Sequence, residues 1–213
     1  MKDILFDLDG TLTDPREGIT RSIAYALERL GIESPPLDAL TFAIGPPLRA
    51  SLARLVGTDE KDVVESALAH YRVRFGDVGL FENQPYDGIA DTLAQLTANG
   101  ARLFVATSKP LVYARRIVEH FALDAHFIAV HGCELDGTRE DKRELLPYLM
   151  AAHAVEPHKA VMVGDRGVDM AAARLHGLRA VGALWGYGSR EELESAGAHD
   201  LCNEPAGLAA LLT

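Results

Sequence analysis

The chain has 213 residues, of which 48% are hydrophobic and 24% are charged, as is typical of a globular protein. Its 31 acidic residues outnumber its 21 Lys and Arg residues, and the formal charge of −10 excludes a nucleic-acid binder built on a broad basic face. The chain has only two cysteines, Cys133 and Cys202, no apolar run of membrane-spanning length and no signal-peptide pattern. We therefore expect a cytoplasmic protein with no nucleic-acid or membrane partner.

The first predicted element is a short buried strand over residues 4–6. Asp14 and Pro15 then predict an N-cap and the first position of a helix, which Gly31 ends. Two further helices are expected at about residues 48–56 and 58–75, because apolar residues recur there at helical spacing. Residues 15–84 are therefore predicted to be all helical.

Strands and helices alternate after residue 84. The predicted strands are apolar runs, as in a parallel sheet whose two faces are both covered by helices. The pattern predicts an α/β, Rossmann-like three-layer core of residues 1–14 and 85–213, interrupted by the helical insertion. The predicted elements are a helix at 87–99, a strand at 103–106, a helix from 110 to about 121, a strand at 127–130, a helix at 141–153, a strand at 161–163, a helix ended by Gly177, and a strand at 180–181.

Polar side chains follow three of these predicted strands. Asp7 and Asp9 come after the first, Thr107 after the strand at 103–106, and Asp165 after the strand at 161–163. Open parallel sheets bind ligands at the carboxyl ends of their strands. We therefore expect these side chains to converge at one edge of the sheet.

Such a cluster favours a cation and a phosphate group. Carboxylates in one place repel each other unless a cation lies between them, and hard oxygen ligands select Mg²⁺. Ser108 and the next amides are expected to open a helix that binds an anion, and Lys142 is expected to add a fixed positive charge. The net charge of −10 therefore does not exclude an anionic substrate, because a local metal site decides its binding.

The run Asp7-Leu8-Asp9-Gly10-Thr11-Leu12-Thr13-Asp14 resembles the first motif of the haloacid dehalogenase superfamily of phosphohydrolases. The other three motifs match in order, and the helical insertion corresponds to the cap domain of that superfamily. Three shorter runs resemble the phosphoglycolate phosphatase-like branch. The matching residues are Thr107 for the second motif, Lys142 for the third, and Gly164-Asp165 with Asp169 for the fourth; the branch runs are Gly45-Pro46-Pro47-Leu48, Ala106-Thr107-Ser108-Lys109-Pro110 and Gly186-Tyr187-Gly188.

The resemblance implies a role for each matched residue. Asp7 is the expected nucleophile, which forms an aspartyl-phosphate, and Asp9 is the expected general acid and base. Mg²⁺ is expected on the carboxylates of Asp7 and Asp165 and on the backbone carbonyl of Asp9. The phosphate is expected to be bound by Thr107, the Ser108 amide and Lys142. Asp169 is expected to contact either a metal-bound water or Lys142.

Four residues keep alternative interpretations. Lys109 competes with Lys142 for the phosphate, and the lysine that loses is expected to be a solvated surface residue. Arg166 either reaches the phosphate or is exposed. Arg49, in the insertion, either contacts the leaving group of the substrate or is a solvated helix residue.

We expect a Mg²⁺-dependent phosphatase that acts on a small phosphorylated metabolite, phosphoglycolate first. A 5'-nucleotidase acting on nucleoside monophosphates is the close alternative, and a phosphomutase of the same superfamily would also keep Asp7 and Asp9. A phospho-accepting receiver domain has a similar acidic site, but it needs only about 120 residues and carries its phosphoacceptor in mid-chain. The sequence leaves monomer and dimer equally open.

Overall fold

The computed structural model describes residues 2–212, and the chain divides into two compact units. One unit comprises Met1–Asp14 and Pro85–Thr213, and the other comprises Pro15–Gln84. We call them the sheet unit and the helical unit. No helix within residues 2–212 combines the length and the apolar character needed to cross a membrane.

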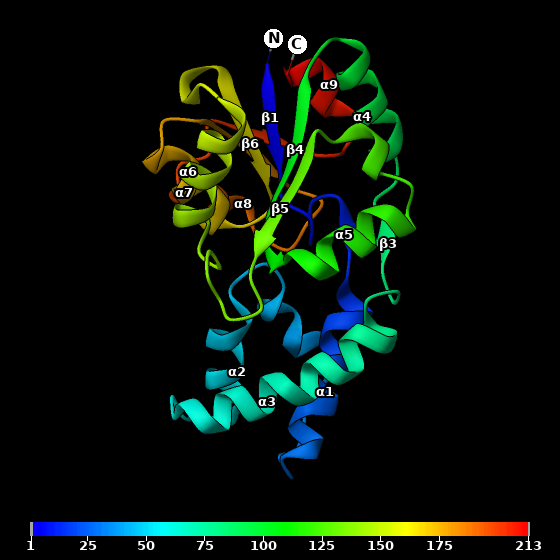
Figure 1. Cartoon of the computed structure of the whole chain (residues 1–213), viewed down its shortest axis with the longest axis vertical. Helices are drawn as coiled ribbons and strands as arrows, with labels where there is room; N and C mark the ends of the chain where they lie inside the picture. Colours follow the sequence, from blue (N-terminus) through cyan, green and yellow to red (C-terminus); the bar gives the residue numbers. More distant parts are fainter. Residues whose placement is uncertain (1, 213) are drawn as a thin grey trace. The chain divides into compact units, whose positions relative to one another are not determined.

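The sheet unit is built on a six-stranded sheet in the order β5-β4-β1-β6-β7-β8 (Figure 1). Each pair of neighbouring strands is parallel, which confirms the predicted parallel core. The first strand lies at the centre because its residues 4–6 are fully buried on both faces. The strands are β1 (Asp3–Phe6), β4 (Arg102–Pro110), β5 (Ala129–Cys133), β6 (Ala160–Gly164), β7 (Arg179–Ala183) and β8 (Asp200–Cys202).

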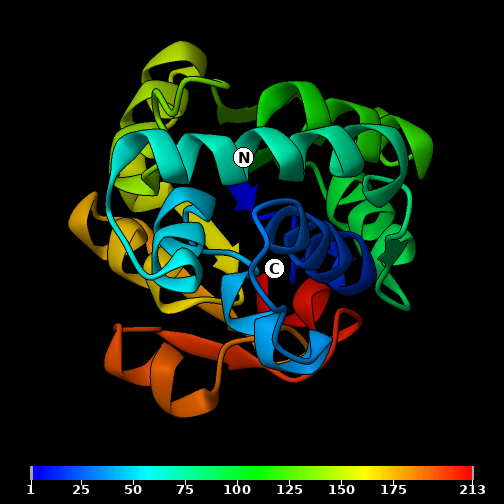
Figure 2. The ribbon, with the colours of Figure 1, turned by 90° about the horizontal axis from the view of Figure 1, so that it is seen from below.

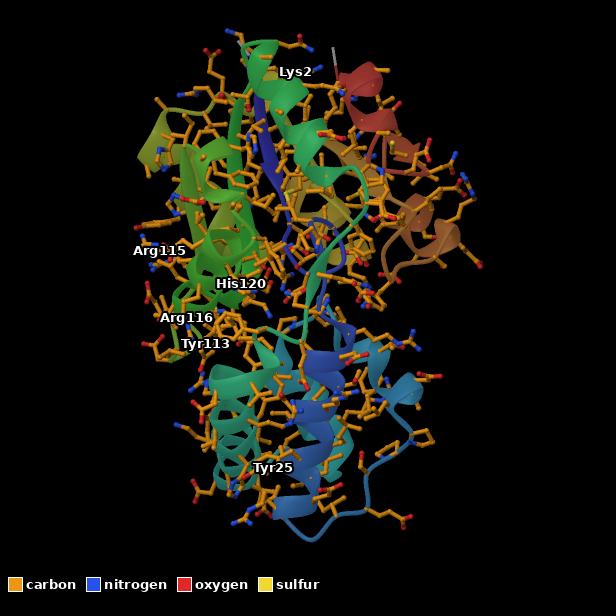
Figure 3. The ribbon with its side chains drawn as sticks, turned by 90° about the vertical axis from the view of Figure 1, so that its right-hand side faces the viewer. Lys2, Tyr25, Tyr113, Arg115, Arg116 and His120 are labelled. Carbon is orange, nitrogen blue, oxygen red and sulfur yellow. The ribbon has the colours of Figure 1, made fainter. Side chains whose placement is uncertain are left out.

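Helices lie on both faces of this sheet (Figure 1). A large apolar cluster joins one face to the helices that follow β5 and β6, and it includes Leu5, Phe104 and Met162 from the strands. Lys2, labelled in Figure 3, precedes β1, and its Nζ donates to the carbonyl of Leu212 at 2.7 Å. The helices are α4 (Ile89–Ala98), α5 (Leu111–His120), α6 (Lys142–His153), α7 (Gly167–Leu175), α8 (Arg190–Ser195) and α9 (Gly207–Leu212), with the 3₁₀ helices η3 (Asp124–His126) and η4 (Pro157–Lys159).

The predicted boundaries hold for most elements of this unit, with two exceptions. The strand predicted at 127–130 lies at Ala129–Cys133. β4 continues to Pro110, so Thr107, Ser108 and Lys109 lie within the strand and not after it. Proline disfavours helical backbone in the residue before it, which keeps the chain extended through Lys109. The prediction that Ser108 opens a helix is therefore wrong, since α5 begins at Leu111.

A histidine pair joins β5 to α6. His131 Nε2 and His153 Nε2 are 2.8 Å apart. Burial lowers the pKa of His131, and the charges of His153, Arg115 and Arg139 lower it further. Arg115 lies on α5 with other polar side chains (Figure 3). His131 is therefore neutral in the folded protein near pH 7.

The helical unit contains α1 (Arg16–Arg29), α2 (Leu48–Val56) and α3 (Lys61–Arg74), as the periodicity predicts. Figure 2 shows α1 nearly end-on while α3 runs across the view. The aromatic rings of Tyr71 and Phe75 stack with their centroids 5.2 Å apart and are buried in this unit. A 3₁₀ helix, η1 (Leu37–Ala43), and a π-helical turn, η2 (Phe75–Gly79), complete it.

A separate two-stranded sheet pairs β2 (Thr13–Asp14) with β3 (Gln84–Pro85). The prediction that Asp14 caps the next helix is wrong. Pro15 occupies the cap position of α1 without a side-chain hydrogen bond, and the Asp14 carboxylate instead accepts a hydrogen bond from the hydroxyl of Tyr187.

Candidate active site

The carboxyl ends of three adjacent strands bring the predicted residues together. β1 lies between β4 and β6, and Phe6 stands opposite Val105 and Val163. The amide of Asp7 donates to the carbonyl of Val163 at 2.9 Å, which extends the pairing by one residue. Asp7 and Asp165 consequently follow neighbouring strands at the same edge of the sheet.

Three buried carboxylates gather at this edge. One oxygen each of Asp7, Asp165 and Asp169 lie within 4.8 Å of one another, and none of the three residues is more than 2% exposed. Burial raises the pKa of Asp165 well above its usual value, and the charges of Asp7 and Asp169 raise it further. This donor set is all oxygen and carries excess negative charge, so it fits a hard divalent cation such as Mg²⁺.

Lys142 is the positive charge nearest to this cluster. It is the first residue of α6, is 2% exposed, and places Nζ 2.8 Å from Asp7 Oδ1. It also forms an ion pair with Asp169. Burial alone would lower the pKa of Lys142, but Asp169 and Asp7 outweigh burial and raise it. Lys142 therefore stays protonated.

Asp169 holds Lys142 and also the start of α7. While its Oδ1 pairs with Lys142, its Oδ2 accepts a hydrogen bond from the Arg166 amide at 3.0 Å. Of the two contacts that the resemblance implies for Asp169, the structure has the one with Lys142. Gly164 is required here, because a Cβ at that position would lie 2.3 Å from Asp169 Cγ.

Asp9 and Lys109 form a second buried pair. Lys109 Nζ lies 2.7 Å from Asp9 Oδ2, and Lys109 is 8% exposed. The expectation that the lysine losing to Lys142 is a solvated surface residue is therefore wrong. Lys109 turns inward because a buried carboxylate stands beside the end of β4.

The other oxygen of Asp9 is available for chemistry. Asp9 Oδ1 is buried, and it has no hydrogen-bond partner among residues 2–212. Burial raises the pKa of the Asp9 carboxyl group, while Lys109 lowers it in part. A carboxyl group with a raised pKa and an unpaired oxygen is suited to give and take a proton.

Thr107 and Ser108 lie on β4 beside this pair. Thr107 is 2% exposed, and its Oγ1 accepts a hydrogen bond from the Lys109 amide at 3.2 Å. The Thr107 hydroxyl therefore keeps its own proton for a further acceptor. The carbonyl of Ser108 accepts a weak hydrogen bond from Cys133 Sγ at 3.0 Å, which fixes the end of β4 against β5.

Backbone of two loops packs tightly around Asp165. A Cβ at Gly10 would lie 2.2 Å from Asp165 Oδ2, and one at Gly186 would lie 2.3 Å from Asp165 Cβ. Thr11 Oγ1 donates to Asp165 Oδ1 at 3.2 Å, and the Tyr187 amide donates to Oδ2 at 2.8 Å. The orientation of Asp165 is therefore set by four neighbours on two different loops.

The two candidate arginines are both paired with glutamates. Arg166 Nε lies 3.0 Å from Glu192 Oε1, on α8. Arg49 Nε lies 2.6 Å from Glu65 Oε1, which joins α2 to α3 within the helical unit. A contact of Arg49 with the substrate stays a prediction.

The sequence singled out Lys109 and Tyr187 but not the roles that the structure gives them. Lys109 precedes a proline, which keeps the chain extended there, and this was the available signal for its inward position. Tyr187 lies between Gly186 and Gly188, and paired glycines around an aromatic residue indicate close backbone packing. The structure explains that packing by the proximity of Asp165.

Comparisons with known proteins agree with this geometry. The model of the haloacid dehalogenase-like hydrolase family matches residues 4–183. A 5'-nucleotidase from Pseudomonas aeruginosa is 49% identical over 98% of this chain and 93% of its own length. A crystal structure of a predicted phosphatase from Clostridium acetobutylicum has a TM-score of 0.96 and 40% identity, and covers 99% of this chain and 97% of that chain.

Two other relatives carry different names. Tyrosine-protein kinase PtkA from Mycobacterium tuberculosis is 40% identical over 90% of this chain, which spans only 65% of that protein. A phosphoglycolate phosphatase from Aquifex aeolicus is 32% identical over 88% of this chain and 86% of its own length. The family match excludes the receiver-domain alternative. The chain belongs to the haloacid dehalogenase-like hydrolase family, and it is a phosphoric monoester hydrolase.

Proposed function

We propose that this protein is a Mg²⁺-dependent phosphatase that hydrolyses a small phosphomonoester through an aspartyl-phosphate on Asp7. The observation that carries the proposal is the cluster of Asp7, Asp165 and Asp169, whose oxygens lie within 4.8 Å of one another beside Lys142. Clustered carboxylates with a cationic neighbour suit the binding of both a metal ion and a phosphoryl group.

In the first step, an oxygen of Asp7 attacks phosphorus, and the bond from phosphorus to the ester oxygen breaks. The departing oxygen takes a proton from Asp9, whose Oδ1 is free of hydrogen bonds within the described chain. Burial raises the pKa of Asp9, which favours the protonated form that this step needs, and Lys109 stabilises the carboxylate left behind. The products of this step are the free alcohol and the aspartyl-phosphate.

In the second step, the Asp9 carboxylate takes a proton from a water molecule, whose oxygen attacks phosphorus. The bond from phosphorus to Asp7 breaks, which releases inorganic phosphate and restores the Asp7 carboxylate. Asp9 is protonated again at the end of the cycle, so the same residue serves as acid and base.

Mg²⁺ would be held by Asp7 and Asp165, with the Asp9 backbone carbonyl as the third expected protein ligand. When bound, the ion neutralises the phosphoryl oxygens and the nucleophile, which otherwise repel each other. Thr107, the Ser108 amide and Lys142 would bind the remaining phosphoryl oxygens, where positive charge and donors lower the barrier. Asp169 keeps Lys142 in place for that role.

Two substrate classes have support. The relative at 49% identity is named a 5'-nucleotidase, and the phosphoglycolate phosphatase from Aquifex aeolicus is 32% identical. We propose a nucleoside 5'-monophosphate as the preferred substrate, with phosphoglycolate as the alternative. A screen of both classes by kcat/KM separates them, and a metabolite of another class well ahead of both would refute the assignment.

The role of Asp7 is tested by Asp7→Asn, which preserves side-chain volume and removes the nucleophile. We expect turnover of p-nitrophenyl phosphate with Mg²⁺ to be lost while the circular dichroism spectrum is kept. Asp91→Asn is the matched control, because Asp91 is exposed on α4. Activity in Asp7→Asn comparable to wild type would refute the mechanism.

Analysis of the products distinguishes two other reactions. With a phosphorylated metabolite as substrate, a phosphomutase would return a rearranged phosphate ester without free phosphate. The relative named a tyrosine-protein kinase makes transfer from ATP to protein tyrosine a second candidate. Labelled phosphate appearing on tyrosine and not in solution would favour the kinase and contradict the phosphatase.

A further inference from the structure

One tyrosine of the sheet unit connects three parts of that unit. The hydroxyl of Tyr187 donates a hydrogen bond to Asp14 Oδ1, and the side chains of Tyr187 and Tyr86 are hydrogen-bonded to each other. The backbone amide of Tyr187 donates to Asp165 Oδ2 at 2.8 Å. Tyr187 thus contacts the candidate metal site with its backbone and two distant segments with its phenol.

Those two segments are the places where the chain leaves and re-enters the sheet unit. Asp14 is the last residue before the helical unit, and Tyr86 is the second residue after it. The segments also touch each other, because the Tyr86 amide donates to the carbonyl of Leu12 at 3.1 Å. Both connections are therefore held at the sheet unit by the same phenol.

The two phenols and the Asp14 carboxylate form one hydrogen-bonded cluster. Burial raises the pKa of Tyr86, and the charges of Asp14 and Asp165 raise it further. The hydrogen bond with Tyr187 lowers the pKa of the Tyr86 phenol only in part, so Tyr86 keeps its proton. Hydrogen bonds that end on a carboxylate are among the stronger ones in proteins.

The backbone of the loop that carries Tyr187 packs closely against its neighbours. A Cβ at Gly186 would lie 2.3 Å from the carbonyl oxygen of Gly10, and a Cβ at Gly188 would lie 2.0 Å from the carbonyl oxygen of Asp165. Trp185 Nε1 donates to the carbonyl of Thr11 at 3.0 Å. The loop is consequently fixed against the first motif.

We propose that Tyr187 is a positioning residue that ties both connections to the helical unit to the backbone that orients Asp165. The expected effect on kcat rests on the proposed function, whereas the expected effect on the two connections does not. The helical unit carries Arg49, whose contact with the leaving group is a prediction from the sequence. An enzyme whose connections are loosened should therefore bind substrate with a misplaced leaving group and lose kcat more than Mg²⁺ affinity.

The test is Tyr187→Phe, which removes the hydroxyl and leaves the amide that holds Asp165. We expect hydrogen–deuterium exchange of the backbone amides in residues 10–14 and 86–88 to become about tenfold faster or more. A hydrogen bond to a charged group stabilises the closed state by about that factor. The urea midpoint reported by Trp185 fluorescence should fall by only about 0.5 M, because the lost hydrogen bond also stabilises the unit against global unfolding. The Mg²⁺ concentration for half activation should stay unchanged. With a nucleoside monophosphate, kcat should fall about tenfold.

Tyr148→Phe is the matched control. Tyr148 is 48% exposed on α6, so this variant should change none of these values.

A second pair of variants tests the acceptor. Asp14→Ala should lose the exchange protection, whereas Asp14→Asn should keep most of it, because the amide oxygen of asparagine still accepts from Tyr187. Wild-type exchange rates in Tyr187→Phe would refute the inference. If the wild type hydrolyses no nucleoside monophosphate, the substrate proposal fails, while the exchange measurement still decides the role of Tyr187.

Discussion

Replacing Lys142 by methionine is the most direct perturbation of charge in the site. Methionine has nearly the same length and no charge, so the substitution removes the ion pairs with Asp7 and Asp169 without opening a large cavity. Those carboxylates are at most 2% exposed and would stay buried without their positive partner. Breaking a buried pair by removing one partner costs about 3–5 kcal/mol.

The loss should be measured by urea unfolding in EDTA, so that no divalent cation replaces the missing charge. With an m value of about 3 kcal/mol/M, the midpoint should fall by roughly 1–2 M. Trp185 is the sole tryptophan of the chain and belongs to the sheet unit, so its fluorescence follows the unit that holds the site.

Two further variants separate the buried charges from a general effect of losing a lysine. Lys159→Met removes an exposed lysine from an ion pair with Glu156 and should leave the midpoint in place. Adding Asp169→Asn to Lys142→Met removes one of the unpaired charges and should recover part of the loss. A midpoint for Lys142→Met equal to that of wild type would refute the account of this charge cluster.

Three other outcomes follow from the same structure. Mg²⁺ at about a hundred times its Kd should raise the Tm of wild type by roughly 5–10 °C and that of Asp165→Asn much less, which a thermal scan against EDTA checks. Because the pKa of His131 is lowered in the folded state, the unfolded chain binds more protons, and stability should fall as pH decreases below about 6.5. The Tm of His131→Gln should depend less on pH than that of the His126→Gln control, and equal slopes would contradict this assignment. Gly10→Ala should lose Mg²⁺ binding by calorimetry, because its Cβ would lie 2.2 Å from Asp165 Oδ2; Gly31→Ala, also at positive φ but in open space, should keep it.

Much of the fold could be predicted because buried parallel strands are short apolar runs. Residues 4–6 and 161–163 have no polar interruption, and both form central strands of the sheet. The last strand, β8, and the helices α8 and α9 were not predicted. Their segments are three to six residues long, which is too short for periodicity to identify.

The site could be predicted where strand topology alone determines proximity. Asp7 and Asp165 follow adjacent strands, so the parallel order was enough to bring them together. Lys109 could not be placed in this way, because its inward direction depends on β4 staying extended to Pro110. Asp14 was predicted to cap a helix because only the neighbouring residues were considered. Its actual partner, Tyr187, lies 173 residues further along the chain.

The central claim is that the phosphoryl group passes through Asp7, and trapping it there is the most direct measurement. Asp9→Asn removes the base that activates water for the second step, while Asp7 keeps its nucleophilic oxygen. After incubation with Mg²⁺ and p-nitrophenyl phosphate, whose leaving group needs no proton, acid-quenched Asp9→Asn should gain the mass of one phosphoryl group on the peptide that contains Asp7. The double variant with Asp7→Asn should gain none. A phosphoryl group on another residue, or an equal gain of mass in both variants, would contradict the account.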